Sequence, residues 1–395
     1  THNLHLAALG SYSYTSTENG RFAPTWVWAQ GLAYRGERKT EDILGNISLD
    51  WKYRWGINNL SATILAEYQK KKIAAFWTQV KGLTNNYFGY DNLGAASDRP
   101  YGGTGSSYAD PSLTSFMGTL TYTLLDRYTL NLTTRADGSS MVGKDHTWGI
   151  FPSISATWDM KKESFLRNNK SISLLNLRTG YGRSGNLGGI SSYLTLRQYI
   201  PVGLISYNGT PTVTMGTLRN SNPDLRWETR STFNIGTDLG LFNNRLLLTA
   251  EYYYSKTTDM LYEYDVPVPT FAFDKLLANI GSMSNSGFEL GIGVVPISKK
   301  DMELNVNVNM AWQKNKLLSL NGKHNGRQMT ASDITPIGGM NGAGFHGGYN
   351  DIIYQIVGQP LGVFYLPHCK GIVDNGHGHN KYDIADLNND NVIDL

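Results

Sequence analysis

The 395-residue chain has a single cysteine, few charged residues and no long apolar run. Cys369 has no second cysteine to pair with, so an internal disulfide is excluded and the redox compartment stays open. No run of about 18 apolar residues occurs, which excludes a membrane-spanning helix. Asp, Glu, Lys and Arg make up 17% of the chain, against about 25% in typical soluble domains. The net charge of +3 comes without a basic block, so we expect no nucleic-acid partner.

Aromatic residues and glycine are abundant by contrast. The chain holds 24 Tyr, 9 Trp and 43 Gly, with 40% of its residues apolar and a mean hydropathy of −0.33. This composition is typical of a large β-structure whose surface is amphipathic rather than uniformly polar.

Strict alternation of apolar and polar residues is the dominant pattern. In the segment NISLDWKYRW, residues 46–55, every second residue is Ile, Leu, Trp or Tyr, and the residues between them are polar or charged. The turn GINN follows, and residues 60–68 alternate again. This period of two predicts an antiparallel hairpin with one apolar and one polar face. Equivalent segments recur along the chain, and we expect about a dozen strands.

The connections between the predicted strands alternate in length. Short turns read GINN, LLDR, LFNN and SKKD, whereas long connections cover roughly 71–113, 185–228, 259–285 and 315 onward. Outer-membrane barrels place short turns on the periplasmic side and long loops outside, with aromatic girdles around the apolar band. We therefore predict an all-β, antiparallel transmembrane outer-membrane β-barrel, with strands over roughly 4–314 and an extracellular loop region over 315–395. A soluble β-sandwich would alternate in the same way, so alternation alone leaves both folds open.

Several longer segments resemble the barrel of SusC/RagA-family TonB-dependent transporters, and they occur in the order of that family. They are RADGSSMVGKDHTWGIFPSISATW (135–158), LRTGYGRSGN (177–186), NPDLRWE (222–228), NIGTDLGLFNNRLLLTAEYYYSKTTDML (234–261) and NIGSMSNSGFELGI (279–292). VGQPLGVFY (357–365) and DLNNDNVIDL (386–395) are also similar to segments of the family. The resemblance covers the chain from about residue 43 to residue 395.

The resemblance implies a barrel of about 22 strands with an N-terminal plug, in the outer membrane of a Gram-negative, Bacteroidetes-type bacterium. A dozen strands cannot close such a barrel, because open sheet edges in lipid leave backbone groups unpaired. Within these 395 residues we find no plug, TonB box or last barrel strands, and the first ten residues lack the features of a signal peptide. We expect the chain to be a portion of a longer protein.

The same resemblance implies TonB-dependent import of nutrient oligomers, either oligosaccharides or oligopeptides. The implied partners are a SusD-like surface lipoprotein that covers the barrel, the TonB–ExbB–ExbD system and outer-membrane lipid. Two alternatives stay open: a passive porin or barrel-anchored adhesin, and a soluble carbohydrate-binding β-protein. Because no paired-carboxylate site stands out, we expect no enzymatic activity, and no cofactor is required.

Four aromatic side chains are candidate ligand-binding residues. Trp77, Tyr87, Phe88 and Tyr90 fall in a predicted long loop, where rings can stack on sugars or on peptide side chains. Packing within the loop, or contact with a lid partner, is the competing interpretation.

The segment DLNNDNVID resembles the first half of a calcium-binding loop. Asp386, Asn388 and Asp390, with the carbonyl of Val392, occupy the positions of the first four ligands of an EF-hand loop. Asn391 stands where the sharp turn prefers Gly, and no flanking helices are predicted. We expect either a bound Ca²⁺ ion or an Asx-rich turn that braces an extracellular loop.

A tight turn is predicted at Asp137 and Gly138, at the end of a strand. Gly accepts positive φ, and an Asp side chain hydrogen-bonds its own backbone in turns. We therefore expect no catalytic role for Asp137.

Overall fold

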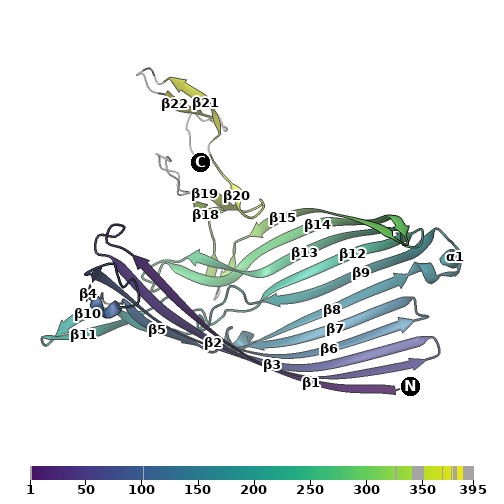
Figure 1. Cartoon of the computed structure of the whole chain (residues 1–395), viewed down its shortest axis with the longest axis horizontal. Coiled ribbons are helices and arrows are strands. Elements are labelled where there is room, and N and C mark those ends of the chain that lie inside the picture. Colours follow the sequence, from purple (N-terminus) through teal and green to yellow (C-terminus); the bar gives the residue numbers. More distant parts are fainter. Residues whose placement is uncertain are drawn as a thin grey trace.

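The computed structural model describes residues 2–100, 102–324, 327–339, 351–366, 368–374, 376 and 380–385. Most of them form one antiparallel sheet of 13 strands (Figure 1). In order across the sheet, the main strands are β1 (His2–Ala23), β2 (Leu32–Trp55), β3 (Asn58–Leu83), β6 (Ser112–Leu124), β7 (Tyr128–Ser139), β8 (Trp148–Asp159), β9 (Ile172–Asn186), β12 (Glu228–Leu241), β13 (Leu246–Asp265), β14 (Lys275–Lys299) and β15 (Met302–Ser319). The predicted all-β, antiparallel fold class is confirmed.

The remaining strands are short, and they either pair with the main sheet or form separate small sheets. They are β4 (Ala96–Asp98) and β5 (Thr104–Ala109), which both pair with β3, the hairpin of β10 (Tyr199–Tyr207) and β11 (Thr210–Thr217), and β16 (Gly322–His324), β17 (Arg327–Met329), β18 (Ile334–Gly339), β19 (Asp351–Ile356), β20 (Val363–Phe364), β21 (Cys369–Asp374) and β22 (Asn380–Ile384). The helices are η1 (Leu93–Ala95), η2 (Lys144–His146), η3 (Met160–Lys162) and α1 (Ser164–Arg167). In the part of the chain that the structure describes, no helix has the length and apolar character needed to cross a membrane.

The short turns lie at one end of the sheet and the longest connections at the other, as predicted, although the connection over 160–171, with η3 and α1, also lies at the turn end (Figure 1). The β2–β3 turn is only two residues long, because Trp55 pairs directly with Asn58. Gly56 in this turn has a φ of +53°, which suits the tight hairpins that twisted strands prefer. In outer-membrane barrels such turns face the periplasm.

Several strands are longer than the sequence predicts. The predicted loop over 71–113 begins inside β3, which continues to Leu83, and the predicted loop over 259–285 shrinks to residues 266–274. A membrane crossing needs about 9–11 residues, so the 24 residues of β2 and the 26 of β3 extend well beyond the bilayer. The loop prediction was wrong there because both faces of these extensions meet water. Apolar alternation therefore stops, although backbone pairing continues.

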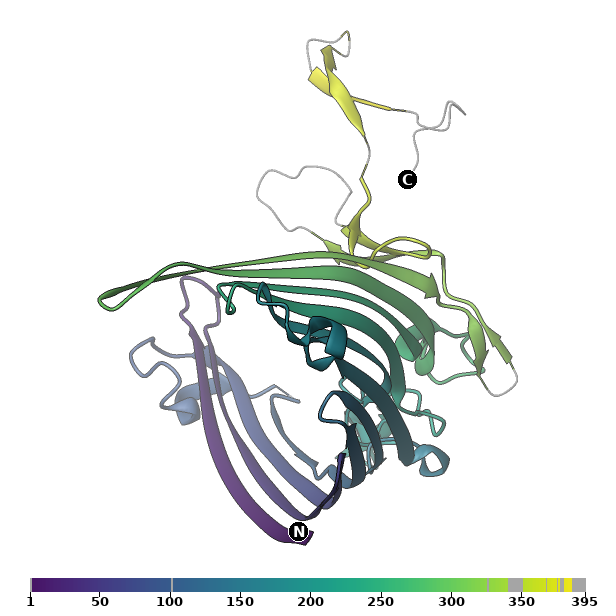
Figure 2. The ribbon, with the colours of Figure 1, turned by 90° about the vertical axis from the view of Figure 1, so that its right-hand side faces the viewer.

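The sheet is curved, with β1 at one margin and β15 at the other (Figure 2). Alternation gives it one polar and one apolar face. On the polar face Ser115 and Ser255 are buried, whereas their apolar-face neighbours Phe116 and Tyr254 are exposed. Side chains crowd together on the inside of a curved sheet, so the polar face is the concave one. The apolar face is convex and exposed, as expected of a lipid-facing wall.

Stacked aromatic pairs mark the two limits of the apolar band. Tyr128 and Trp158 stack near the short turns, with ring centroids 6.1 Å apart. Phe116 and Trp148 stack toward the long connections, at 6.0 Å. Phe116 pairs with Ala136, eight residues beyond Tyr128 on β7, which is about 27 Å along an antiparallel strand. This spacing matches the scale of the apolar band and its girdles in outer-membrane barrels.

Glu163, between η3 and α1, anchors the first of these aromatic pairs. Its carboxylate accepts hydrogen bonds from the Tyr128 hydroxyl (2.5 Å) and the Trp158 indole (3.0 Å), and pairs with Arg127 at 2.6 Å. Glu163 is buried. The hydrogen bonds from Tyr128 and Trp158, with the Arg127 charge, lower the pKa of Glu163 below its usual 4.5.

We expect Glu163→Gln to lower the midpoint of thermal unfolding by several degrees at neutral pH, because the charge-assisted hydrogen bonds are lost. A lowered folded-state pKa stabilises the fold above pH 4.5, and this contribution is lost as the pH falls through the lowered pKa. The difference between parent and variant should therefore narrow on acidification. Unfolding monitored by circular dichroism at pH 7 and pH 3 measures this, with Glu303→Gln, next to the β14–β15 turn at the same end of the sheet, as control. A difference that stays constant with pH would contradict it.

Candidate functional site

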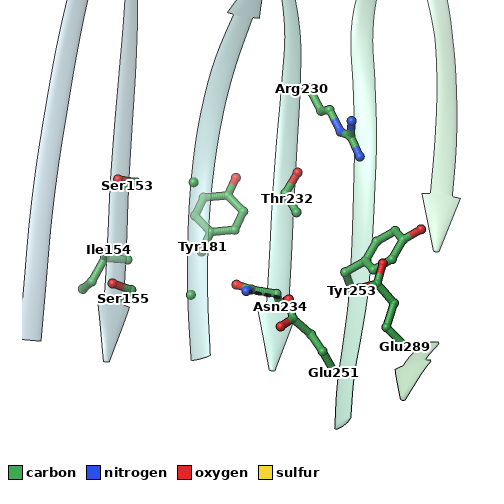
Figure 3. Close-up of a pocket in the computed structure, with 12 residues that line it drawn as sticks. Ser153, Ile154, Ser155, Tyr181, Arg230, Thr232, Asn234, Glu251, Tyr253 and Glu289 are labelled. Atoms are coloured by element: carbon green, nitrogen blue, oxygen red, sulfur yellow. Dashed lines mark hydrogen bonds between the residues drawn. The ribbon is translucent and has the colours of Figure 1, made fainter. Parts of the chain in front are cut away.

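The concave face carries a shallow cavity that crosses five strands. Its volume is about 510 Å³. The lining residues come from β8, β9, β12, β13 and β14, and are Ser153, Ile154, Ser155, Gly180, Tyr181, Gly182, Arg230, Thr232, Asn234, Glu251, Tyr253 and Glu289 (Figure 3). A second cavity of about 540 Å³ shares Glu251 and Glu289 and continues toward β15. The two cavities make one polar strip across the wall.

Strand alternation and glycine shape the floor of this strip. Gly180 and Gly182 pair with Ser155 and Ser153, so a stretch of the wall carries only hydrogens and small hydroxyl side chains. A Cβ atom on Gly287 would lie 2.7 Å from the ring of Tyr253, which covers that glycine. Larger residues at these positions would fill the cavity or displace the ring. The floor therefore stays flat, with its backbone close to the lumen.

An ion-pair cluster crosses the strip from β9 to β13. The guanidinium of Arg178 donates to Asp238, with Nε 3.2 Å from Oδ2, and through Nη1 to Glu251. Asn234 donates a further hydrogen bond to Glu251 at 3.2 Å. All three charged side chains are partly exposed. One cation is therefore shared by two carboxylates on adjacent strands.

A third carboxylate raises the negative charge of the strip. Glu289 lies directly opposite Glu251 in the β13–β14 register, and like charges in that position repel. Within the described residues Glu289 has no ion-pair or hydrogen-bond partner. Arg230, at the other end of the cavity, donates only to the hydroxyl of Ser255. The strip thus offers an acid and a guanidinium that have no ion-pair partner in the described part of the chain, with Tyr253 between them (Figure 3).

This arrangement suits hydrogen bonding to a polar solute. Its donors and acceptors lie on rigid strands along an open wall. Among the described residues, no group of three or more His, Cys, Asp and Glu side chains comes close enough to hold a metal ion.

The four aromatic residues chosen from the sequence do not form one site. Trp77 lies on β3, where its ring covers Gly105 of β5, at 2.4 Å from a hypothetical Cβ atom. Tyr90 covers Gly20 of β1 in the same way. Tyr87 and Phe88 make an edge-to-face pair, and Tyr87 is 89% exposed. Trp77 and Tyr90 are thus engaged in loop packing, and none of the four lines the concave strip. Their role in ligand binding stays a prediction.

The calcium-like residues Asp386, Asn388, Asp390 and Val392 lie outside the described residues. A bound Ca²⁺ ion at this segment therefore stays a prediction.

The predicted turn at Asp137 and Gly138 was wrong. Both residues belong to β7, where they pair with Ser115 and Thr114 of β6 on one side and with Gly149 and Trp148 of β8 on the other. Continuous pairing on both sides leaves no place for a turn. Asp137 is only 8% exposed, and its two carboxylate oxygens share a bifurcated hydrogen bond from Nε of Arg135, at 2.8 and 3.0 Å.

The sequence analysis also missed the cluster of charged residues in the polar strip. Its members are widely spaced in the sequence and adjacent only through strand register: Arg178, Asp238, Glu251 and Glu289. A signal was present, since each occupies a polar-face position next to at least one apolar residue of its strand. That signal marks the face of the residue, but it does not identify which charges meet across neighbouring strands.

Comparison with known proteins identifies the family of this wall. Residues 1–363 match the family described as TonB dependent receptor-like, beta-barrel. TonB-dependent receptor SusC of Bacteroides thetaiotaomicron is 36% identical over 220 residues, which are 53% of this chain and 21% of that protein. A TonB-dependent receptor of Formosa agariphila is 33% identical over 330 residues, which are 80% of this chain and 32% of the relative. The chain thus spans less than a third of the length of these relatives.

Solved structures share the fold. The RagAB peptide transporter superposes with a TM-score of 0.74 and 22% identity, over 96% of this chain and 40% of that chain. The siderophore receptor PiuA of Acinetobacter baumannii gives a TM-score of 0.50 and 15% identity, over 82% and 46% of the two chains.

The family match confirms three expectations from the sequence. It places the chain in the outer membrane, it assigns the chain to a class of transport proteins rather than enzymes, and it excludes the soluble carbohydrate-binding alternative. The convex apolar face and its aromatic limits fit that location. The chain belongs to the TonB-dependent receptor β-barrel family, and it is similar in sequence to SusC and in fold to the RagAB peptide transporter.

Proposed function

We propose that this chain forms part of the barrel wall of an importer that moves oligosaccharides or oligopeptides across the outer membrane. TonB, with ExbB and ExbD, would supply the energy, and a SusD-like lipoprotein would cover the entrance. The proposal rests chiefly on the polar strip, because a flat, hydrogen-bonding concave wall over five strands suits a hydrated oligomer. Similarity to SusC and to the RagAB peptide transporter supports it.

The passive porin and the adhesin are the competing functions. A porin would use the same wet wall, but its transport would not depend on energy. An adhesin would bind ligand without moving it. Uptake therefore separates both transporters from an adhesin, and its energy dependence separates the importer from a porin.

The test uses the full-length protein in its own cells. A gene-deletion strain and its complemented parent receive fluorescent oligosaccharides and oligopeptides, and periplasmic accumulation is measured with and without a proton uncoupler. We expect accumulation of one cargo class, lost on deletion and lost with the uncoupler. Uptake that persists with the uncoupler indicates a porin, and surface binding without accumulation indicates an adhesin.

A matched pair of variants tests the wall itself. Thr232 lines the strip, and its neighbour Phe233 lies on the convex face. We expect Thr232→Trp to reduce uptake several-fold, because the indole fills the space above Gly180 and Gly182. Phe233→Trp should leave uptake unchanged, since it replaces one lipid-facing aromatic with another. Equal uptake by the two variants would mean that cargo does not pass along this strip.

A further inference from the structure

A row of cationic side chains crosses the convex face near the long connections. Strand register aligns Arg183 of β9, Lys256 of β13 and Lys316 of β15 in one row, with Ser231 of β12 and Ser284 of β14 between them. Every second strand in this row contributes a cation. Neighbouring strands lie about 4.8 Å apart, so the Cα atoms of successive cationic residues in this row lie about 10 Å apart.

The row lies directly beyond the apolar band. Lys256 follows Tyr254 by two residues on the same face of β13, and Lys314 follows Trp312 in the same way on β15. Both aromatic side chains are exposed on the convex surface. Aromatic residues of outer-membrane barrels lie at the level of the lipid headgroups. The cations are therefore at headgroup level, in the leaflet at the long-loop end.

No acidic side chain among the described residues neutralises these cations. Over the described ranges, Lys256, Lys314 and Lys316 have no ion pair or hydrogen bond, and all three are exposed. Arg183 donates only a long hydrogen bond, 3.4 Å, to the hydroxyl of Ser231. The next acid along β13, Asp259, is three residues beyond Lys256, and its carboxylate already pairs with Arg226 at 2.5 Å. The row thus holds an uncompensated positive charge.

The opposite margin of the sheet provides an internal comparison. Three convex-face lysines of β2 and β3 also lie beyond the apolar band, but each has an acidic partner. Lys39 pairs with Glu37 at 3.0 Å, Lys70 with Asp110 at 3.4 Å and Lys72 with Glu41 at 3.8 Å. The lack of partners on β9–β15 is therefore specific to that part of the wall.

We propose that the row of Arg183, Lys256 and Lys316, together with Lys314 two residues before Lys316 on the same face of β15, binds phosphate-bearing headgroups of lipid in the outer leaflet. Lysine ammonium groups and a forked guanidinium are the usual protein ligands of phosphate, and Ser231 and Ser284 add hydroxyl donors. The exposed rings of Tyr181, Phe233 and Tyr254 lie one step closer to the apolar band, where acyl chains would contact them. Contact between these rings and acyl chains, next to the cationic row on its apolar-band side, favours a lipid over free phosphate as the ligand. The inference depends on outer-membrane location and not on the proposed import.

The test compares two triple variants of the full-length protein purified from outer membranes. One is Lys256→Gln, Lys314→Gln and Lys316→Gln, and the matched control is Lys39→Gln, Lys70→Gln and Lys72→Gln. Both lose three convex-face positive charges, but only the first loses unpaired ones. After exchange into a neutral detergent, bound lipid phosphorus per protein is measured, together with the thermal midpoint after addition of phosphatidic acid, phosphatidylcholine or inorganic phosphate.

The parent and the control should retain lipid phosphorus, and phosphatidic acid should raise their thermal midpoint. The first triple variant should lose at least half of that phosphorus and most of the shift. Equal retention and equal shifts in both triple variants would overturn the proposal. An equal shift of the parent with inorganic phosphate would overturn the lipid as ligand, and an equal shift with phosphatidylcholine would overturn the role of anionic charge.

Discussion

Replacing Leu132 with Arg is expected to destabilise the folded barrel in a bilayer by about 2–4 kcal/mol, the cost of a lipid-facing Arg near the membrane midplane. Leu132 lies on the convex face of β7, with Leu120 and Ile154 beside it on the neighbouring strands. It is four residues from Tyr128 and four from Ala136, midway between the aromatic limits of the apolar band. Its cross-strand neighbours on both sides are apolar, so neither of them can receive the guanidinium.

The adjacent Thr133 is the matched control. Its side chain lies on the concave face, where its hydroxyl is 3.1 Å from that of Thr119. Thr133→Arg should lower the free energy of unfolding much less, because the guanidinium enters the water-filled interior of the barrel. The measurement is a urea titration of the full-length protein in phosphatidylcholine vesicles, followed by heat-modifiable gel mobility. Equal costs for Leu132→Arg and Thr133→Arg would contradict the assignment of the two faces.

Replacing Arg178 with Ala is expected to destabilise the protein by about 2 kcal/mol. The change leaves Asp238 and Glu251 without their cation, next to the carboxylate of Glu289 on the adjacent strand. Removing one partner of a buried ion pair costs about 3–5 kcal/mol, and an exposed pair contributes about 0–1 kcal/mol. Because the Arg178 side chain is 32% exposed, an intermediate value is expected.

Two further variants test this explanation. Arg54→Ala removes an Arg whose ion pair with Asp126 is well exposed at the turn end, and it should change stability by less than about 1 kcal/mol. Adding Glu251→Gln to Arg178→Ala should restore part of the loss, because one repelling carboxylate is removed. The measurement is the same urea titration in vesicles. Failure of the second substitution to restore stability would show that the loss comes from packing rather than from charge.

Strand existence, pairing order and the two-faced wall were predictable from the sequence. Apolar and polar residues alternate over the whole of 46–55 and of 60–68. Such alternation indicates β-strands where a turn such as GINN separates the two segments. The lengths of the strands were less predictable. Beyond the bilayer both faces of β3 meet water, so the apolar signal ends about a dozen residues before the hydrogen bonding does.

The candidate site was predictable only as a face and not as a set of contacts. Arg178 and Glu251 are 73 residues apart in the sequence, and their meeting depends on the register of β9, β12 and β13. Asp137 and Gly138 also show that pairing with distant strands, rather than the local sequence, decides the structure. Their turn propensity was read correctly, but pairing with β6 and β8 on both sides overrides it.

The sequence by itself determined the fold class, the apolar and polar faces of the wall and the resemblance to SusC/RagA-type transporters, because these depend on period, turn chemistry and local motifs. Only the tertiary structure decided which charges share a strip on the concave face and which cations align unpaired on the convex face. The physical reason is that both depend on strand register and sheet curvature. Long-range backbone pairing sets these properties, and no local stretch of the chain encodes them.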